Sequence, residues 1–286
     1  SDCSATVNTN YSLTVSTNNG CVASDSIEVM VENPPSISSS TNVTGTETCG
    51  EISISVATDA VDGTGSWSHS NGLGLFSSPT DASTTFTTNT FNSAQNLTWT
   101  ASSGACAGST AEINALFNQP NTSNLTDLEA SASWLWGGLT NSEYNEANNW
   151  YKWDGFKWLR ETSSTPGNSD KIYVQSNNES GLCVSASSSL TISSDIKSLF
   201  ISAESTTILS GDISIAGDIN NNGTLNANSG SLTINGGSDQ VIHGTGNTSF
   251  NNLVLNKTSG DLIMNTPLTV VGNLNLTSGI IQNGNN

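Results

Sequence analysis

One apolar pattern is written twice in the last third of the chain. Residues 209–225 read LSGDISIAGDINNNGTL, and 55 positions later residues 264–280 read MNTPLTVVGNLNLTSGI. Five apolar positions coincide between the copies, Gly217 coincides with Gly272, and most polar residues differ. A pattern that is kept only at apolar positions is typical of a repeated structure with an inward-facing side.

Short apolar-x-apolar units fill the chain from about residue 182 to its end. Examples are LTI, ISI, LVL and LNL, which recur every five to nine residues between Ser, Gly, Asn and Asp. Each unit suits a short strand whose alternate side chains enter a narrow shared core. We therefore predict a parallel β-helix over residues 182–286, with two to three coils per 55 residues. The Asn-rich corners are expected to bend tightly and to stack from coil to coil.

A second repeat lies in the first half of the chain. Residues 13–35, LTVSTNNGCVASDSIEVMVENPP, are similar to residues 97–120, LTWTASSGACAGSTAEINALFNQP. Both have a strand, a Gly-containing turn with a Cys, a second alternating strand and a Pro exit, which predicts a β-hairpin that ends a module. A complete module then occupies residues 36–119, and residues 1–35 are the end of a preceding one. Short strands between turn signals predict an Ig-like β-sandwich with Trp67 and Trp99 in its core.

The chain contains five cysteines, Cys3, Cys21, Cys49, Cys106 and Cys183. No CxxC pair is present and the chain has two histidines, so a zinc site is not expected, and calcium as a structural ion stays open. In an extracellular chain such cysteines form disulfides. Because Cys49 and Cys106 bracket the complete module, we predict a bridge between them, worth roughly 3 to 5 kcal/mol. The partners of Cys3, Cys21 and Cys183 are left open.

An aromatic segment follows the module. Residues 120–133 read as a polar linker, and residues 134–181 begin with five of the seven tryptophans, at Trp134, Trp136, Trp150, Trp153 and Trp158. These rings could form a platform on which sugar rings stack. Alternatively, they could cap the first coil of the β-helix and protect a sheet end that would otherwise recruit other chains. The cap is favoured because the segment lies where a solenoid needs one.

Charge and hydropathy exclude several classes of partner. The formal net charge is −18, and all six basic residues lie after position 151. The first 151 residues therefore carry no Lys or Arg that could neutralise phosphate groups. For this reason neither nucleic acid nor an anionic membrane surface is expected as a partner. No run of 18 apolar residues is present, so no direct membrane insertion is expected. The chain starts SDCSA without a basic-then-apolar leader, which favours a mature product or an internal piece of something longer.

The order of these parts resembles that of very large surface adhesins of the Bacteroidota, including those associated with gliding motility. The resemblance rests on YSLTVSTNNGC hairpins, then WLWGG and NEANNW, then GDINNNGTLNANSGSLTING coils, and it covers nearly all 286 residues. It implies an extracellular, surface-displayed stalk or fibre that is exported by type 9 secretion machinery and held by outer-membrane anchoring proteins. It also implies O-glycosylation of a Ser or Thr that follows an Asp and precedes an apolar residue. Ser26, which lies between Asp25 and Ile27, matches this motif.

An enzyme is the other interpretation to consider, because some polysaccharide-degrading enzymes are also parallel β-helices. Such chemistry needs paired carboxylates, or a base supported by a cation, on neighbouring coils. The acidic residues of the predicted β-helix do not cluster in the sequence, and no G-x-S-x-G, P-loop or HExxH motif is present. We therefore expect a non-catalytic adhesin segment without cofactors that contacts surface glycans or other external surfaces. The alternative is a carbohydrate-binding module centred on the Trp134 to Trp158 cluster.

Overall fold

The computed structural model describes residues 8–30, 36–37, 43–58, 60–61, 64–70, 73–102, 108–180, 183–184 and 189–284. Regular structure in this part is almost entirely β, and its one α-helix, α1 (Asn177–Ser180), has four residues. The predicted all-β class is confirmed. Contacts divide the chain into two compact units, residues 1–48 with 52–117, and residues 49–51 with 118–286.

The first unit begins with an antiparallel hairpin of β1 (Thr9–Ser16) and β2 (Val22–Val29). Tyr11 pairs with Ile27 and Val15 pairs with Ala23, so apolar residues gather on one face of the hairpin. Tyr11 and Ile27 are 60% and 66% exposed. The pairing agrees with the alternation in the sequence.

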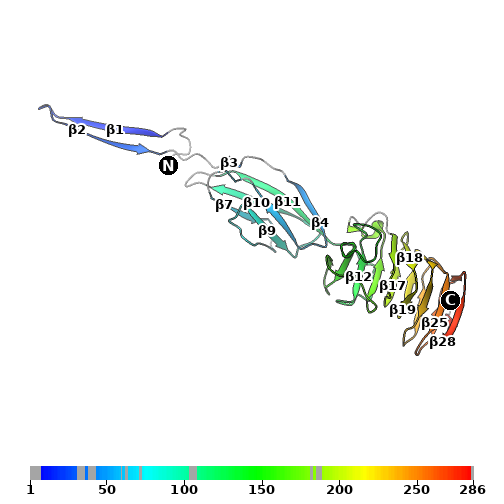
Figure 1. The fold of residues 1–286 in the computed structure, drawn as a ribbon. Helices are drawn as coiled ribbons and strands as arrows, with labels where there is room; N and C mark the ends of the chain where they lie inside the picture. Colours follow the sequence, from blue (N-terminus) through cyan, green and yellow to red (C-terminus); the bar gives the residue numbers. More distant parts are fainter. Residues whose placement is uncertain are drawn as a thin grey trace. The chain divides into compact units, whose positions relative to one another are not determined.

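Two further antiparallel sheets of the first unit share one hydrophobic core (Figure 1). The larger sheet orders β4 (Val43–Cys49), β11 (Thr110–Asn118), β10 (Ala94–Ser102) and β7 (Thr64–His69), and the smaller orders β5 (Ser53–Ala57), β9 (Ser83–Thr88) and β8 (Gly74–Phe76). A short pair, β3 (Ser36–Ile37) and β6 (Ala60–Val61), lies outside both. Trp67 and Trp99 are buried, as predicted, and their rings meet edge to face at 5.5 Å. The likeness to immunoglobulin domains stays a prediction.

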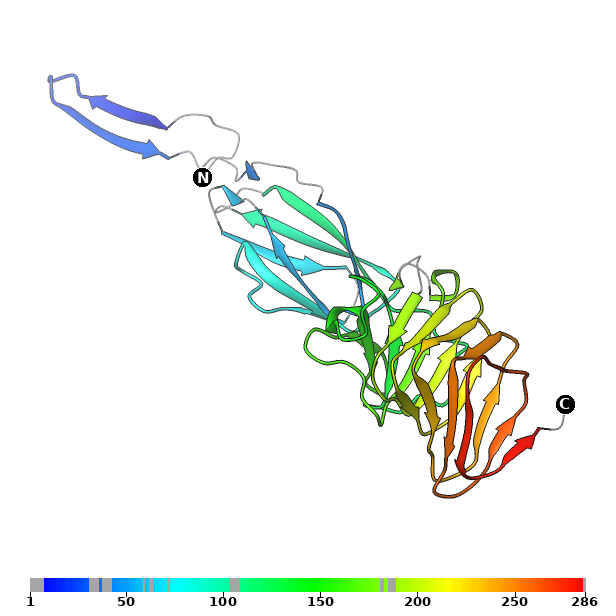
Figure 2. The same cartoon turned by 45° about the vertical axis from the view of Figure 1, so that its right-hand side comes forward.

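The second unit is a three-sided β-solenoid of about four turns, so the predicted β-helix is confirmed (Figure 2). Its strands form three sheets, here called the long, middle and short sheets. The long sheet orders β14 (Trp158–Arg160), β13 (Trp150–Trp153), β12 (Ser133–Trp136), β15 (Lys171–Val174), β17 (Ser198–Ile201), β20 (Ile219–Asn221), β23 (Gln240–His243), β26 (Leu262–Met264) and β29 (Ile281–Asn283). Neighbouring coils pair in parallel, and among the described strands of this unit only β12, β13 and β14, at the start of the long sheet, pair with one another antiparallel.

The middle sheet orders β16 (Ser189–Ile192), β18 (Thr206–Ser210), β21 (Thr224–Ser229), β24 (Asn247–Phe250) and β27 (Thr269–Val270). The short sheet orders β19 (Ile213–Ile215), β22 (Ser231–Ile234), β25 (Asn252–Asn256) and β28 (Leu274–Ser278). Every strand of these two sheets pairs in parallel with its neighbours. Stacking one coil on the next therefore satisfies the backbone groups of the interior strands.

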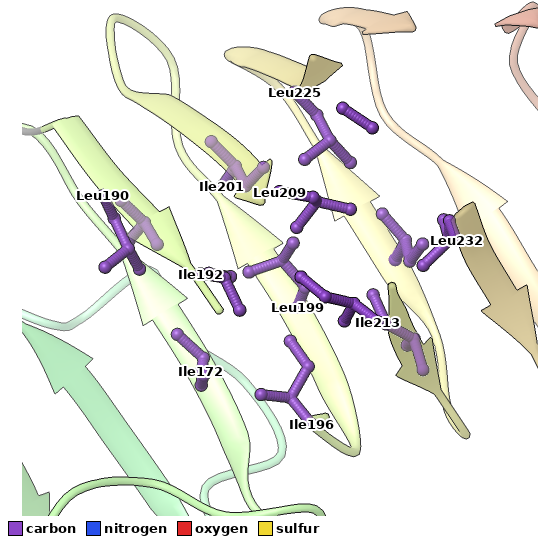
Figure 3. Close-up of a cluster of buried hydrophobic side chains, with 14 of the residues drawn as sticks. Ile172, Leu190, Ile192, Ile196, Leu199, Ile201, Leu209, Ile213, Leu225 and Leu232 are labelled. Atoms are coloured by element: carbon purple, nitrogen blue, oxygen red, sulfur yellow. The ribbon is translucent and has the colours of Figure 1, made fainter. Parts of the chain in front are cut away.

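Period-2 alternation fills the solenoid core. In β17, Leu199 and Ile201 are buried while Ser198 and Phe200 are half-buried. Figure 3 shows such inward side chains from strands of different sheets meeting between the ribbons. The sequence units of the form apolar-x-apolar are therefore strands that each contribute two side chains to one continuous core.

The 55-residue sequence repeat does not coincide with a whole number of coils. Residue pairing along the long sheet runs from Leu199 to Ile219, Ile242, Met264 and Asn283, which gives coils of 20, 23, 22 and 19 residues. A 55-residue shift thus spans two to three coils, as predicted. It nevertheless moves a strand to another side, because β19 in the short sheet aligns with β27 in the middle sheet. The repeat reflects the similarity of the strand-and-turn units within one coil.

Side-chain oxygens at the corners accept hydrogen bonds from backbone N–H groups of the next coil. The donors and acceptors lie 19 to 23 residues apart, and the N···O distances are 2.7 to 3.1 Å, for Ser214 to Asp195, Ser231 to Asp212, Val241 to Asp218, Asp261 to Asp239, Thr245 to Asn222 and Asn273 to Asn252. Asn side chains were expected to stack on one another. Instead, Asp and Asn together bond to the next backbone, because a carboxylate or amide oxygen reaches one strand spacing.

Glycine allows the coils to approach closely at one corner. Gly211 and Gly230 both have a positive φ, of +86° and +79°. A Cβ on Gly230 would lie 2.2 Å from the carbonyl oxygen of Gly211. Any larger residue would therefore clash with the preceding coil as well as strain the backbone.

Replacing Asp212 by alanine should lower the free energy of unfolding by about 0.5 to 1.5 kcal/mol, because the Ser231 N–H would lose its 2.8 Å partner. Asp212→Asn keeps an acceptor oxygen at the same place and is the matched control. Urea unfolding curves of both variants and the parent measure the difference. Equal losses in the two variants would contradict a role for the acceptor.

A lysine is buried among the coils after β25. Lys257 is 4% exposed, and its Nζ donates to the carbonyl oxygens of Gly236 (3.2 Å) and Ser238 (2.8 Å) and to Oε1 of the buried Gln240 (2.7 Å). Burial lowers the pKa of Lys257, and the attraction of the carboxylates nearby, led by Asp239, opposes the shift.

Stability should therefore rise with pH through the lowered pKa of Lys257 and up to its ordinary value of 10.5. In that interval the unfolded chain holds the proton and the folded chain has released it, so each step in pH favours the folded state. We expect Lys257→Met to lack this part of the pH profile, whereas Lys197→Met, at a lysine side chain that is 41% exposed, should keep it. Urea midpoints measured between pH 8 and 10.5 provide the comparison, and identical profiles for parent and Lys257→Met would refute the assignment.

Candidate functional site

Four of the five clustered tryptophans are buried. Trp134, Trp136, Trp150 and Trp158 are at most 2% exposed, and Trp153 is half-buried. Strand β12 lies between β13 and β15, so both of its edges are paired, and all four of its residues are buried, so both of its faces are covered. The burial expected of a cap is therefore observed, and a platform of five exposed rings is excluded.

The inner face of β12 continues the solenoid core. Trp134, Trp136 and Trp150 belong to the same apolar cluster as Ile172 and Leu190 of the first coil. Trp150 meets Trp136 edge to face at 5.0 Å, and its Nε1 donates to the carbonyl oxygen of Tyr144 at 2.8 Å. These rings fill the end of the core, as predicted for a cap.

The cap also covers the edges of the first coil. The long sheet continues past β15 into β12, and Glu143 forms a parallel bridge with Thr191 of β16. Unpaired strand edges are templates for aggregation, so pairing them protects the start of the solenoid.

The outer face of β12 is covered by residues 122–128, within the segment that was predicted to be a linker. Leu125 is 8% exposed and shares a cluster with Leu135, Tyr151 and Trp158. The Trp158 Nε1 donates to Thr122 Oγ1 at 2.8 Å. The linker prediction is wrong here, because two apolar residues, Leu125 and Leu128, anchor an otherwise polar segment to the sheet.

The disulfide prediction is also wrong. Cys49 is bonded to Cys183, with Cα atoms 5.3 Å apart, and Cys106 lies outside the described residues. The bridge lies within the second unit, since residues 49–51 belong to it. The Gly50 carbonyl accepts from the Arg160 N–H at 3.0 Å, and Glu51 pairs with Arg160 at 3.7 Å, so Cys49 is held beside the cap. Sequence spacing favoured Cys106 because Cys49 and Cys106 bracket the complete module at residues 36–119, and no local pattern indicated Cys183.

Three other positions singled out in the sequence lie in the first unit or outside the described residues. Ser26 is exposed on β2, and its N–H donates to Asp25 Oδ1 at 2.9 Å, which leaves the hydroxyl accessible. Cys21 is an exposed free thiol. Cys3 lies outside the described residues.

A recess of about 140 Å³ lies on the outer surface of the long sheet, and we call it the sheet recess. Its floor is formed by outward side chains of β15, β17, β20 and β23 in two rows across the strands. One row contains Tyr173, Phe200, Asn220 and His243, and the other contains Lys171, Ser198 and Asp218. Thr126 and Asp127 form a wall. Sequence reasoning missed these residues, although their positions follow the coil period with alternate side chains outward.

Hydrogen bonds and ion pairs fix one end of the sheet recess. The Tyr173 hydroxyl donates to the Thr126 carbonyl oxygen at 2.9 Å, and burial raises the pKa of Tyr173 to about 12. Lys171 pairs with Glu129 at 2.8 Å, and this hydrogen bond lowers the pKa of Glu129. The Lys171 Nζ also donates to the Asp127 carbonyl oxygen at 3.1 Å. This ammonium is therefore already engaged by the wall.

The other end of the sheet recess keeps open hydrogen-bonding capacity. Phe200 is half-buried and lies 5.9 Å from Tyr173, ring centre to ring centre. Asn220 Oδ1 accepts from the Asn222 amide at 3.2 Å, so the amide N–H groups of Asn220 remain as donors. Within the described part of the chain, the His243 imidazole has no hydrogen-bond partner.

A second recess, of about 320 Å³, lies beside the β13–β14 hairpin, and we call it the hairpin recess. Trp153 and Leu159 give it an apolar lining, and Lys152, Asp154 and Glu161 stand around it. Trp153 packs against Trp158 at 5.2 Å. The polar groups are largely engaged, because Asp154 pairs with Lys157 at 3.2 Å and Glu161 accepts from Ser164 at 2.7 Å.

The solenoid carboxylates have structural partners. Asp195, Asp212, Asp218 and Asp239 each accept from the next coil, and Glu204 accepts from the Asn178 amide at 2.6 Å. No group of three His, Cys, Asp or Glu residues that could hold a metal ion occurs among the described residues. No helix in the same part of the chain is long and apolar enough to cross a membrane.

No protein-family model matches the chain, and a search of curated proteins found no match.

Proposed function

We propose that the chain is a non-catalytic segment of an extracellular repetitive adhesin and that it serves as part of a surface stalk. The observation that carries the proposal is the capped solenoid, in which each coil is joined to the next by three parallel sheets and by Asp and Asn hydrogen bonds. Such a structure resists bending without any bound ligand, because each coil is paired over most of its length.

The disulfide and the composition support an extracellular location. Cys49 and Cys183 are joined, and disulfides persist mainly in oxidising compartments. Ser, Thr, Asn and Gly dominate the surface of the coils, and the net charge of −18 favours solubility. As an adhesin segment, the chain would rely on type 9 secretion machinery and outer-membrane anchoring proteins, and repeated weak contacts would supply avidity.

Surface labelling tests the location and therefore the proposal. Antibodies raised against the 286-residue chain should label intact cells of the organism that produces it, and brief protease treatment of intact cells should remove the signal. Labelling that appears only after permeabilisation would overturn the proposal. Antibodies against a cytoplasmic protein of the same cells are the control for membrane integrity.

A carbohydrate-binding module remains the second candidate function, in a changed form. Burial of Trp134, Trp136, Trp150 and Trp158 removes the original platform. The half-buried Trp153 in the hairpin recess keeps one aromatic residue of that cluster accessible.

A further inference from the structure

We propose that the sheet recess binds one residue of a neutral polysaccharide. The proposal names a class of ligand for the adhesin segment described above. It rests on the proposed function only in assuming that the chain meets polysaccharides at the cell surface. The binding site itself is argued from the side chains that line the recess.

The recess combines the two kinds of group that recognise a sugar ring. A pyranose has an apolar C–H face and a rim of hydroxyl groups, so it needs an aromatic surface next to hydrogen-bonding side chains. Phe200 offers the aromatic surface, because its side chain is only half-buried. Tyr173, the other aromatic residue of the row, is almost fully buried, at 5% exposed. Asn220 and His243 follow Phe200 on the next two strands of the same row.

The spacing of the row fits a chain of sugar residues rather than a compact molecule. Neighbouring strands lie about 4.8 Å apart, so a ligand lying across β17, β20 and β23 meets a new side chain at each strand. At about 140 Å³ the recess is smaller than the sites that enclose whole drug-sized molecules. It suits one residue of a polymer whose other residues rest along the outer face of the solenoid.

Hydrogen-bonding capacity supports the same ligand class. The Asn220 amide can donate, and the His243 imidazole can donate and accept. Asp218 uses Oδ1 for the Val241 N–H, and a carboxylate retains further acceptor sites. Donors and acceptors together suit hydroxyl groups, which act as both.

The charged side chains that line the recess favour a neutral ligand over an acidic one. Asp127 and Asp218 line the recess, and the one ammonium in its lining, that of Lys171, is paired with Glu129. An acidic polysaccharide would therefore bring its carboxylates towards unpaired negative charge, in a chain that carries −18 overall. We expect uronic acid polymers to bind more weakly than neutral ones.

Affinity gel electrophoresis of the full 286-residue chain tests the proposal. The probes are three neutral polymers, namely a soluble β-glucan, a xylan and a mannan, and two acidic polymers, alginate and polygalacturonate. We expect at least one neutral polymer to retard the parent chain, with little or no retardation by the acidic ones. No retardation by any neutral polymer, or stronger retardation by the acidic ones, would overturn the proposal.

Variants then locate the site. Phe200→Ala and Asn220→Ala should each weaken binding, the former at least tenfold, with thermal unfolding curves used to confirm that the variants are folded. Phe156→Ala removes the same ring at a position that is 90% exposed outside the recess, and it should bind as the parent does. Loss of binding in Trp153→Ala with full binding in Phe200→Ala and Asn220→Ala would place the site in the hairpin recess and refute the assignment.

The outcome is independent of the surface-labelling experiment. If antibodies label the chain on intact cells but it binds no neutral polymer, the proposed stalk stands and the proposed sugar site is refuted. If the chain binds a neutral polymer but is found only inside cells, the sugar site stands and the stalk is refuted.

Discussion

Trp150→Ala is expected to lower the free energy of unfolding of the second unit by about 3 to 5 kcal/mol, the range for removing a large buried aromatic side chain. Trp150 is fully buried, packs against Trp134, Trp136 and Tyr144, and donates a hydrogen bond to the Tyr144 carbonyl oxygen. The truncation would leave a cavity and an unpaired carbonyl group at the end of the solenoid core. Urea unfolding followed by Trp fluorescence measures the loss.

Phe156→Ala is the matched control for this truncation. Phe156 is 90% exposed on the turn between β13 and β14, so its removal should change stability by no more than about 0.5 kcal/mol. If Trp150→Ala also stayed within that limit, the tryptophans would not cap the solenoid. A Trp150→Phe variant should recover part of the loss because it refills most of the cavity without the hydrogen bond.

The solenoid could be predicted from the sequence because its physics is local. A unit such as LFI at residues 199–201 places two apolar side chains inward and one outward, and the same rule holds on every side of the coil. The cap could be predicted for a related reason, since a solenoid has an end and the tryptophans adjoin it. Which side of the coil a strand occupies could not be predicted, because all three sides obey the same alternation.

The disulfide and the linker were mispredicted because both depend on contacts between distant segments. Cys49 and Cys183 are separated by 134 residues, and their approach depends on residues 49–51 docking beside the cap. Leu125 and Leu128 look like isolated apolar residues in a polar stretch until the outer face of β12 is known. The sheet recess escaped detection for the same reason, since Phe200, Asn220 and His243 become neighbours only after coiling.

Removal of the disulfide has the second large expected effect. Cys183→Ser should lower the free energy of unfolding of the second unit by roughly 2 to 5 kcal/mol, because the bridge closes a loop of 134 residues and so limits the unfolded chain. The chain-entropy account gives about 5 kcal/mol for a loop of that length, and engineered or native bridges often deliver less. The lost contacts of the buried Cys183 side chain add to the effect.

Cys49→Ser should produce a loss similar to that of Cys183→Ser, and the double variant should lose no more than about 0.5 kcal/mol beyond either single one, since the two residues act through one bond. Cys21→Ser is the matched control, because it removes an exposed free thiol and should leave stability unchanged. Reducing agent should bring the parent chain to the stability of the double variant and leave that variant unaffected. If the parent chain kept its stability under reduction, or if the losses of the two single variants were additive, the bridge would not be what holds residues 49–51 to the capped solenoid.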